Sequence, residues 1–220
     1  MLKHICLVGV LFVSISCQNA AVCPSTENPE CEVPTPTPEV EPQTPIEVGT
    51  DVPPEAGLFN ANISYTNFDA SDEAKVEKAI VIIKKVIASS EFRNRVLNFS
   101  YKGKLGFVDN GGFTNAQIYQ KLLDGKEELK PVVDHTMDLD LELYYSLKST
   151  VGYTYPDVIR IWMNTKFFDS YTPVEVADNV FHEWTHKLGF DHASSYSESR
   201  DYSVPYGLGY LIEELGAKMK

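Results

Sequence analysis

Positive charge is scarce at the start of this chain and is nowhere concentrated. Residues 17–56 contain eight acidic side chains and no lysine or arginine, and Lys3 is the only such basic residue before them. Residues 57–220 carry 18 basic and 23 acidic side chains, within a formal net charge of −12 for the whole chain. A basic patch is the usual electrostatic footprint of a nucleic-acid-binding protein. We therefore expect no nucleic-acid partner.

Cysteine is absent from residues 57–220. The four cysteines of the chain all lie before that point, at Cys6, Cys17, Cys23 and Cys31. A thiol nucleophile in the main part of the chain is therefore excluded. Cys6 would be removed with the signal peptide described next. If Cys17 carries a lipid, Cys23 and Cys31 can pair in an oxidising compartment; if it does not, three cysteines remain and one has no partner.

The longest apolar run near the start of the chain is too short for a membrane-spanning helix. Residues 5–15 read ICLVGVLFVSI and follow Lys3 and His4, which predicts a signal peptide over residues 1–16. Ser16, a small residue, follows the run and stands directly before Cys17. This resembles the bacterial lipobox, although Ser14 replaces the leucine that is usual three positions before the cysteine. The resemblance implies a lipid anchor at Cys17 and a place in the bacterial cell envelope, at the outer membrane or the cell surface. An ordinary cleaved signal peptide, and hence a secreted protein, is the alternative.

Residues 17–56 predict an acidic, proline-rich linker. Nine of the thirteen prolines lie between Pro24 and Pro54, with acidic residues among them and few large apolar side chains. Such a segment cannot bury enough apolar surface to offset the entropy of ordering, and it favours extended polyproline conformations. We interpret it as a stalk that holds a domain away from a membrane; a plain disordered tail is the alternative.

Residues 57–220 predict one domain that mixes helices and strands, of the α+β class. Ser71 is a candidate N-cap for the first helix, and Thr114 and Gly125 bound another. Alternating polar and apolar residues indicate strands. The expected strands cover residues 60–65, 139–145 and 157–164, and the expected helices cover residues 72–89, 91–98, 115–124 and 206–220.

One further helix has unusually clear ends. Thr172 is placed to cap it, Pro173 takes its first position and Glu175 completes a capping box. Gly189 is placed to end it in a left-handed conformation. The helix would bury one apolar face, made of Ala177, Val180, Phe181, Trp184 and Leu188.

Three of the five histidines fall in or just after this helix. His182 and His186 are four residues apart, so they share a face with Cβ atoms about 6 Å apart, which lets two imidazoles reach one zinc ion. The turn at Gly189 would return His192 as a third ligand. Glu183 can lie beside the metal without binding it, where a base can deprotonate a zinc-bound water. Three ligands with an open fourth position are typical of a catalytic zinc site.

The stretch HEWTHKLGFDH matches the metzincin signature H-E-x-x-H-x-x-G-x-x-H at every fixed position. The resemblance implies that His182, His186 and His192 bind Zn²⁺ and that Glu183 is the general base and acid. It also implies a zincin-like fold: a twisted mixed sheet, an active-site helix and a small C-terminal helical part. Residues 157–164 are similar to the edge strand that binds substrate in such enzymes, with a plain core strand as the alternative.

The chain departs from this family after the motif. Metzincins place a methionine in a tight turn below the zinc, often in Ser-x-Met-x-Tyr, whereas residues 203–206 read SVPY. Pro205 is compatible with a tight turn. Tyr206 matches the tyrosine that in relatives binds zinc or stabilises the oxyanion; a packing role, or Tyr202 in its place, is the alternative.

Two other polar residues are candidates for the zinc site or its surroundings. We expect His135 to be a surface histidine, and Asp191 either to orient a zinc ligand or to face solvent. The predicted function is a monomeric zinc-dependent endopeptidase, a hydrolase that cleaves protein or peptide substrates with a metal-activated water and Glu183 as general base. The alternative is a non-enzymatic surface lipoprotein with a structural zinc site or a role in adhesion.

Overall fold

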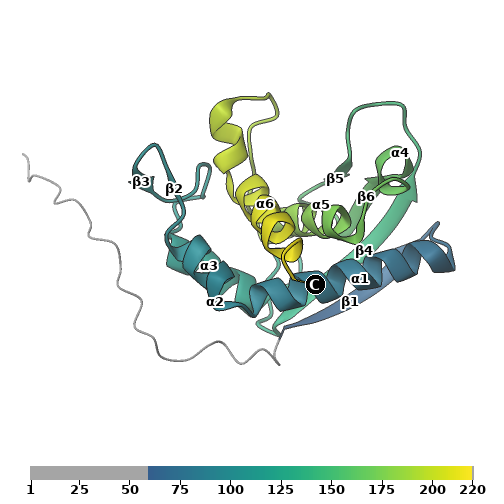
Figure 1. The fold of residues 1–220 in the computed structure, drawn as a ribbon, viewed down its shortest axis with the longest axis horizontal. Helices are drawn as coiled ribbons and strands as arrows, with labels where there is room; N and C mark the ends of the chain where they lie inside the picture. Colours follow the sequence, from purple (N-terminus) through teal and green to yellow (C-terminus); the bar gives the residue numbers. More distant parts are fainter. Residues whose placement is uncertain (1–58, 220) are drawn as a thin grey trace, which may run out of the picture. The chain divides into compact units, whose positions relative to one another are not determined.

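The computed structural model describes residues 59–219 (Figure 1). The expected signal peptide, the linker, the anchor at Cys17 and the pairing of Cys23 with Cys31 lie outside the described residues. Among residues 59–219, no helix has the length and the apolar character needed to cross a membrane.

The described residues form a mixed sheet, a small hairpin and six α-helices, which confirms the predicted α+β class. The sheet has the order β1-β4-β6-β5, in which β1, β4 and β6 are parallel and β5 is antiparallel to β6. Its strands are β1 (Asn60–Thr66), β4 (Thr136–Tyr144), β5 (Gly152–Thr154) and β6 (Arg160–Asn164), and the hairpin is β2 (Ser100–Tyr101) with β3 (Lys104–Leu105). The helices are α1 (Ala70–Ile87), α2 (Ser90–Leu97), α3 (Asn115–Asp124), α4 (Thr165–Phe168), α5 (Pro173–Lys187) and α6 (Val204–Gly216), with a 3-10 helix η1 at Glu198–Tyr202.

The two faces of the sheet differ because side chains alternate along each strand. On β4, Met137, Leu139, Leu141 and Leu143 are buried in the core that the helices share. The side chains between them are acidic and lie on the other face, where Arg160 of β6 donates to Asp140 at 3.0 Å and to Glu142 at 2.5 Å. The alternation read from the sequence therefore sets which face of the sheet meets the helices.

Helix α5 is held against the sheet by a buried polar contact as well as by its apolar face. The Trp184 side chain is fully buried, and its Nε1 donates to the Glu127 carboxylate at 2.6 Å. The same carboxylate oxygen accepts from the backbone N–H of Asp138 on β4 at 2.9 Å. Burial raises the pKa of Glu127, while these two hydrogen bonds oppose that rise. One carboxylate thus fixes the position of α5 relative to β4.

The structure corrects two expectations from the sequence, and for residues 157–164 it decides between the edge strand and the core strand in favour of the core strand. Asp69, not Ser71, caps α1, because its carboxylate accepts from the backbone N–H groups of Ser71 and Asp72. Residues 157–164 do not form an edge strand, since β6 lies between β4 and β5, and the edge is β5. Pro205 does not lie in a separate tight turn, because it takes up the first turn of α6.

The cap of α1 gives a direct test of the first correction. Replacing Asp69 with alanine removes a capping box, so we expect the thermal midpoint of unfolding to fall by about 2–4 °C. Ser71→Ala is the matched control and should leave the midpoint unchanged, since the structure assigns its side chain no part in the cap. Thermal unfolding followed by circular dichroism measures both, and a larger loss in Ser71→Ala would contradict the assignment.

Candidate metal centre

Both predicted ends of α5 are present in the structure. The Thr172 backbone N–H donates to the Glu175 carboxylate at 2.8 Å, and Glu175 N–H donates back to Thr172 Oγ1 at 3.4 Å, which completes the capping box. At the other end Gly189 has φ +83° and its N–H donates to the His186 carbonyl at 3.0 Å. A side chain there would also meet Glu128, whose carboxylate oxygen lies 2.7 Å from an ideal Cβ position.

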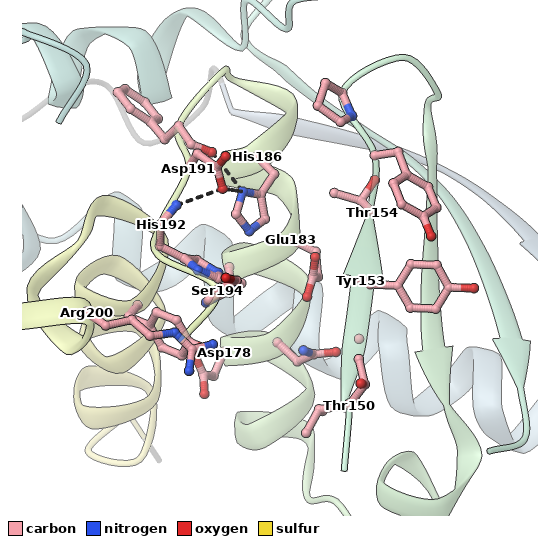
Figure 2. Close-up of a pocket in the computed structure, with 18 of the residues that line it drawn as sticks. Thr150, Tyr153, Thr154, Asp178, Glu183, His186, Asp191, His192, Ser194 and Arg200 are labelled. Carbon is pink, nitrogen blue, oxygen red and sulfur yellow. Dashed lines mark hydrogen bonds and ion pairs between the residues drawn. The ribbon is translucent and has the colours of Figure 1, made fainter. Parts of the chain in front are cut away.

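This turn brings the three histidines of the motif together. One ligand atom from each of His182, His186 and His192 lies within 4.8 Å of the other two. The Nε2 atoms of His182 and His192 are 3.2 Å apart, and the ring centroids are separated by 4.9–5.2 Å. Figure 2 shows His186 on α5 and His192 on the chain that returns beside it. The predicted ligand set therefore forms a group that could hold one metal ion.

The hydrogen bonds of two of these rings suit metal binding. His186 Nδ1 lies 2.7 Å from the Phe190 carbonyl oxygen, and His192 Nδ1 lies 3.0 Å from that of Ala193. A carbonyl oxygen accepts only, so each Nδ1 carries the proton and each Nε2 keeps its lone pair for a ligand bond. Burial lowers the pKa of His182 and of His186, which favours the neutral form that binds metals. Neutral imidazoles suit several transition metals, zinc among them.

Glu183 lies beside the triad on the same helix, as the motif predicts. Its side chain is only 4% exposed, and Figure 2 shows it between the histidines and strand β5. Burial raises the pKa of Glu183 to about 8; Asp178 adds to the rise and Lys187 opposes it. The neighbouring strand comes close because Gly152 has no side chain: an ideal Cβ there would lie 3.2 Å from the Glu183 carboxylate and 2.9 Å from Asn179 Oδ1.

Of the two candidate tyrosines, Tyr206 lies at the triad and Tyr202 lies away from it. The Tyr206 ring centroid lies 4.4 Å from that of His182 and 4.7 Å from that of His192. Its hydroxyl accepts from Arg200 Nη2, and burial raises its pKa, so the phenol is neutral at ordinary pH. Tyr202 instead packs on Tyr101, with ring centroids 4.6 Å apart.

The remaining two candidates have different roles. The Asp191 side chain is 90% exposed; its Oδ1 accepts from the His192 backbone N–H at 2.7 Å and stays 3.9 Å from His186 Nδ1. Asp191 therefore shapes the loop that carries His192 more than it orients a ring. His135 is half-buried, bonds the Leu123 carbonyl through Nδ1 at 2.8 Å and takes no part in the triad.

The triad forms one wall of a cleft, and strand β5 with its flanking residues 149–156 forms another (Figure 2). Val151 accepts from the Asn164 backbone N–H at 2.8 Å, so Val151 and Asn164 are a hydrogen-bonded pair of the antiparallel ladder. Residues alternate in such a ladder. Gly152 and Thr154 therefore direct their backbone N–H and C=O groups to the free edge of the sheet, on the side of the cleft.

Lys187 was not predicted, yet it holds this strand to the helix. Its side chain is buried, and its Nζ donates to Thr154 Oγ1, to the Val158 carbonyl at 2.5 Å and to the Arg160 carbonyl at 3.1 Å. Burial lowers the pKa of Lys187 to about 8. These contacts hold the turn between β5 and β6 against the end of α5. The free edge of β5 is therefore fixed in position beside the candidate metal centre.

No known protein family matches this chain. A search of curated proteins also finds no match.

The triad predicts one divalent metal ion per chain. Removal of a ligand should weaken binding of zinc or cobalt(II) by more than about 100-fold, since loss of a mere supporting contact already costs 10–100-fold. His192→Ala is the test and His135→Ala is the matched control, which should keep full affinity. Metal content after dialysis and the visible spectrum of the cobalt form measure both. Equal metal content in the two variants would contradict the assignment.

Asp178 predicts a pH-dependent stability. Burial raises its pKa from 3.8 to about 7, and Glu213 on α6 and Glu175 on α5 add to the rise; the Tyr210 phenol on α6 also faces it. A carboxyl whose pKa is raised by folding stabilises the fold while protonated. Its contribution is complete below pH about 4 and is lost as the pH rises to about 7.

Asp178→Asn should therefore raise the free energy of unfolding by roughly 2–4 kcal/mol at pH 8 and change it little at pH 4. Chelated protein is used, so that no bound cation acts on the carboxylate. Urea unfolding at the two pH values measures the difference. The same gain at both values, or none at pH 8, would be inconsistent with an Asp178 pKa that folding raises.

Proposed function

We propose that this chain is a zinc-dependent endopeptidase of the metzincin type. The observation that carries the proposal is the convergence of three imidazoles beside a buried glutamate, in a cleft edged by a strand with free backbone groups. The arrangement of elements is compatible with a zincin-like fold. A mixed sheet precedes the helix that carries the motif, and α6 follows it.

The donor set fits zinc. Three neutral histidines with a free fourth position are the ligands of known catalytic zinc sites, and here two of them are held in the right tautomer by backbone carbonyls. When bound, zinc supplies Lewis acidity toward the scissile carbonyl and toward a water molecule. The remaining chemistry belongs to the side chains around the triad.

Glu183 is the proposed general base. It follows the first ligand directly in the chain, and its carboxylate faces the cleft between the triad and β5. There it can take a proton from the attacking water and return it to the leaving amine. Burial at 4% exposure disfavours the charged form that a general base needs, whereas a cation held by the triad would favour that form. A carboxyl group is costly to bury, so its presence indicates a chemical role more than a structural one.

Strand β5 is the proposed binding site for the substrate main chain. Gly152 and Thr154 offer backbone N–H and C=O groups at an unpaired edge, and an extended peptide can add to such an edge as one more strand. Lys187 fixes that edge to α5. The peptide bond to be cut would then lie across the triad and Glu183.

Tyr206 is the proposed stabiliser of the developing oxyanion. Its hydroxyl accepts from Arg200, which leaves the phenolic proton free to be donated to a carbonyl oxygen as that oxygen gains charge. Because its pKa is raised by burial, the phenol keeps that proton at ordinary pH. This geometry favours donation over direct binding of the metal.

The setting of the enzyme is proposed from the sequence alone. A signal peptide over residues 1–16, a lipid anchor at Cys17 and an acidic, proline-rich stalk over residues 17–56 would hold a monomeric catalytic domain, residues 57–220, in a bacterial cell envelope. Protein or peptide substrates and a membrane would be its partners. Release as a secreted protein is the alternative.

A non-enzymatic lipoprotein with a structural zinc site explains fewer of the observations. A structural site is usually closed by a fourth protein ligand, whereas this group consists of three histidines in an open cleft. The alternative also gives no role to the buried Glu183. We therefore retain it only as the outcome of a negative activity test.

The proposal predicts that Glu183→Gln keeps the metal and loses hydrolysis. General acid–base catalysis contributes about 10²–10⁴-fold, so turnover of an unbiased peptide library should fall by at least that factor, with metal content unchanged. Glu214→Gln is the matched control, because Glu214 lies on the exposed face of α6 and pairs with Arg95. Mass spectrometry of the library, with and without a chelator, measures cleavage. Metal-loaded wild-type protein that cuts no peptide would overturn the proposal.

A further inference from the structure

Arg200 carries a positive charge into the cleft without a carboxylate to balance it. It lies in η1, and its side chain is half-buried in the lining of the same cleft as the triad. Within residues 59–219 no aspartate or glutamate oxygen lies within 4.0 Å of its guanidinium. By contrast, Arg95 contacts both oxygens of Glu214 at 3.1 and 2.8 Å, and Arg160 contacts Asp140.

The contacts of Arg200 leave part of its guanidinium unmatched. One Nη donates to the Tyr206 hydroxyl, and the Cζ atom lies 4.4 Å from the centre of the Tyr206 ring. The Nε atom is buried and has no hydrogen-bond partner in the described part of the chain. A buried donor without an acceptor is unfavourable. The charge of Arg200 therefore lacks an anionic partner within residues 59–219, and an acidic ligand in the cleft would supply one.

The position of Arg200 places such a ligand next to the reacting atoms. The Tyr206 ring that it covers lies 4.4 Å from His182 and 4.7 Å from His192. Figure 2 shows Arg200 on the wall of the cleft opposite to Tyr153 and Thr154 of β5, with His186 and His192 between them. A peptide bound along β5 would therefore present a side chain or its end to Arg200.

The acidic residues of the cleft do not cancel this charge. Glu128 is paired with Lys121 at 2.9 Å, and Asp191 is 90% exposed, where water screens it. Asp178 and Glu183 also line the cleft, but among residues 59–219 neither carboxylate lies within 4.0 Å of the Arg200 guanidinium. Among the described residues that line the cleft, Arg200 is the only lysine or arginine.

We propose that Arg200 binds a carboxylate of the substrate, so that the cleft selects peptides with a carboxylate close to the bond that is cut. The planar guanidinium matches a carboxylate with two parallel hydrogen bonds, and its contacts with the Tyr206 ring and hydroxyl hold the side chain in place. The carboxylate belongs either to an acidic side chain or to the C-terminus of the peptide. This inference rests on the proposed function in that it takes the ligand to be a peptide substrate.

Binding tests the inference separately from cleavage. Zinc-loaded Glu183→Gln protein is titrated with fluorescent peptides that differ only in Glu against Gln at each position, and in a free against an amidated C-terminus. We expect at least one carboxylate to lower the Kd by about tenfold or more, with the effect weakening at high salt. The position of the effective Glu, or the effect of amidation, distinguishes the two sources of the carboxylate.

The same titration is repeated after substitution of Arg200. Arg200→Gln in the Glu183→Gln background should remove the preference for acidic peptides and leave the Kd of neutral peptides within about twofold. Arg200→Lys should keep part of that preference, because lysine keeps the positive charge but lacks the paired N–H groups of the guanidinium. Arg95→Gln is the matched control and should keep the full preference. If Arg200→Gln does not fold, Arg200→Lys alone must still reduce the preference.

Three results would overturn the inference. These are equal binding of acidic and neutral peptides to the unsubstituted site, no binding of any peptide, and an equal loss for both kinds of peptide in Arg200→Gln. The last would mean that Arg200 only supports Tyr206. If instead acidic peptides bind through Arg200 but the wild-type protein cuts none, the proposed function fails while the carboxylate site stands.

Discussion

The arrangement of the three histidines depends on the hydrogen bond between His186 Nδ1 and the Phe190 carbonyl oxygen, which is 2.7 Å long. The bond joins the last turn of α5 to the chain that leaves it, and it forms because Gly189 takes a left-handed conformation between the two residues. It also keeps the proton on Nδ1, which leaves Nε2 free for a metal. One contact therefore sets the direction of the chain toward His192 and the ligand chemistry of His186.

Helix α5 buries more polar groups than a purely structural helix would. Glu183 and Lys187 are 4% and 5% exposed, and the pKa values of both are displaced toward the neutral form by burial. Such groups cost stability, so the helix must be held by other means. The capping box at Thr172, the hydrogen bond from Trp184 to Glu127 and the fully buried apolar face supply that support. Buried polar side chains that lower stability, on a helix that other contacts stabilise, are the pattern expected at a functional site.

The features that could be predicted from the sequence are those that depend on residues close together in the chain. The capping box, the glycine at the end of α5 and the meeting of the three histidines all follow from spacing along one helix. Strand order does not, so the sequence left an edge strand and a core strand as alternatives for residues 157–164. The true edge, β5, has only three residues, which are too few to show alternation. The cap of α1 was misplaced because Asp69 and Ser71 are both good caps two residues apart. Lys187 and Arg200 were not predicted. The role of Lys187 depends on partners about 30 residues away, and that of Arg200 depends on the shape of the cleft.

The floor of the centre differs from the turn that the motif led us to expect. Helix α6 begins directly at Val204, with Pro205 in its first turn, so Tyr206 is held on a helix. Gly207 follows, where an ideal Cβ would lie 2.8 Å from the Phe99 ring; the absent side chain lets α6 approach the stacked pair Phe99 and Phe107. The aromatic ring of Tyr206 packs against the rings of His182 and His192, with centroids 4.4 and 4.7 Å away. A ring fixed on a helix can support two imidazoles as a side chain in a tight turn would, and it adds a hydroxyl that a methionine lacks. The packing of α6 therefore gives the candidate site a rigid wall, although residues 203–206 contain no methionine.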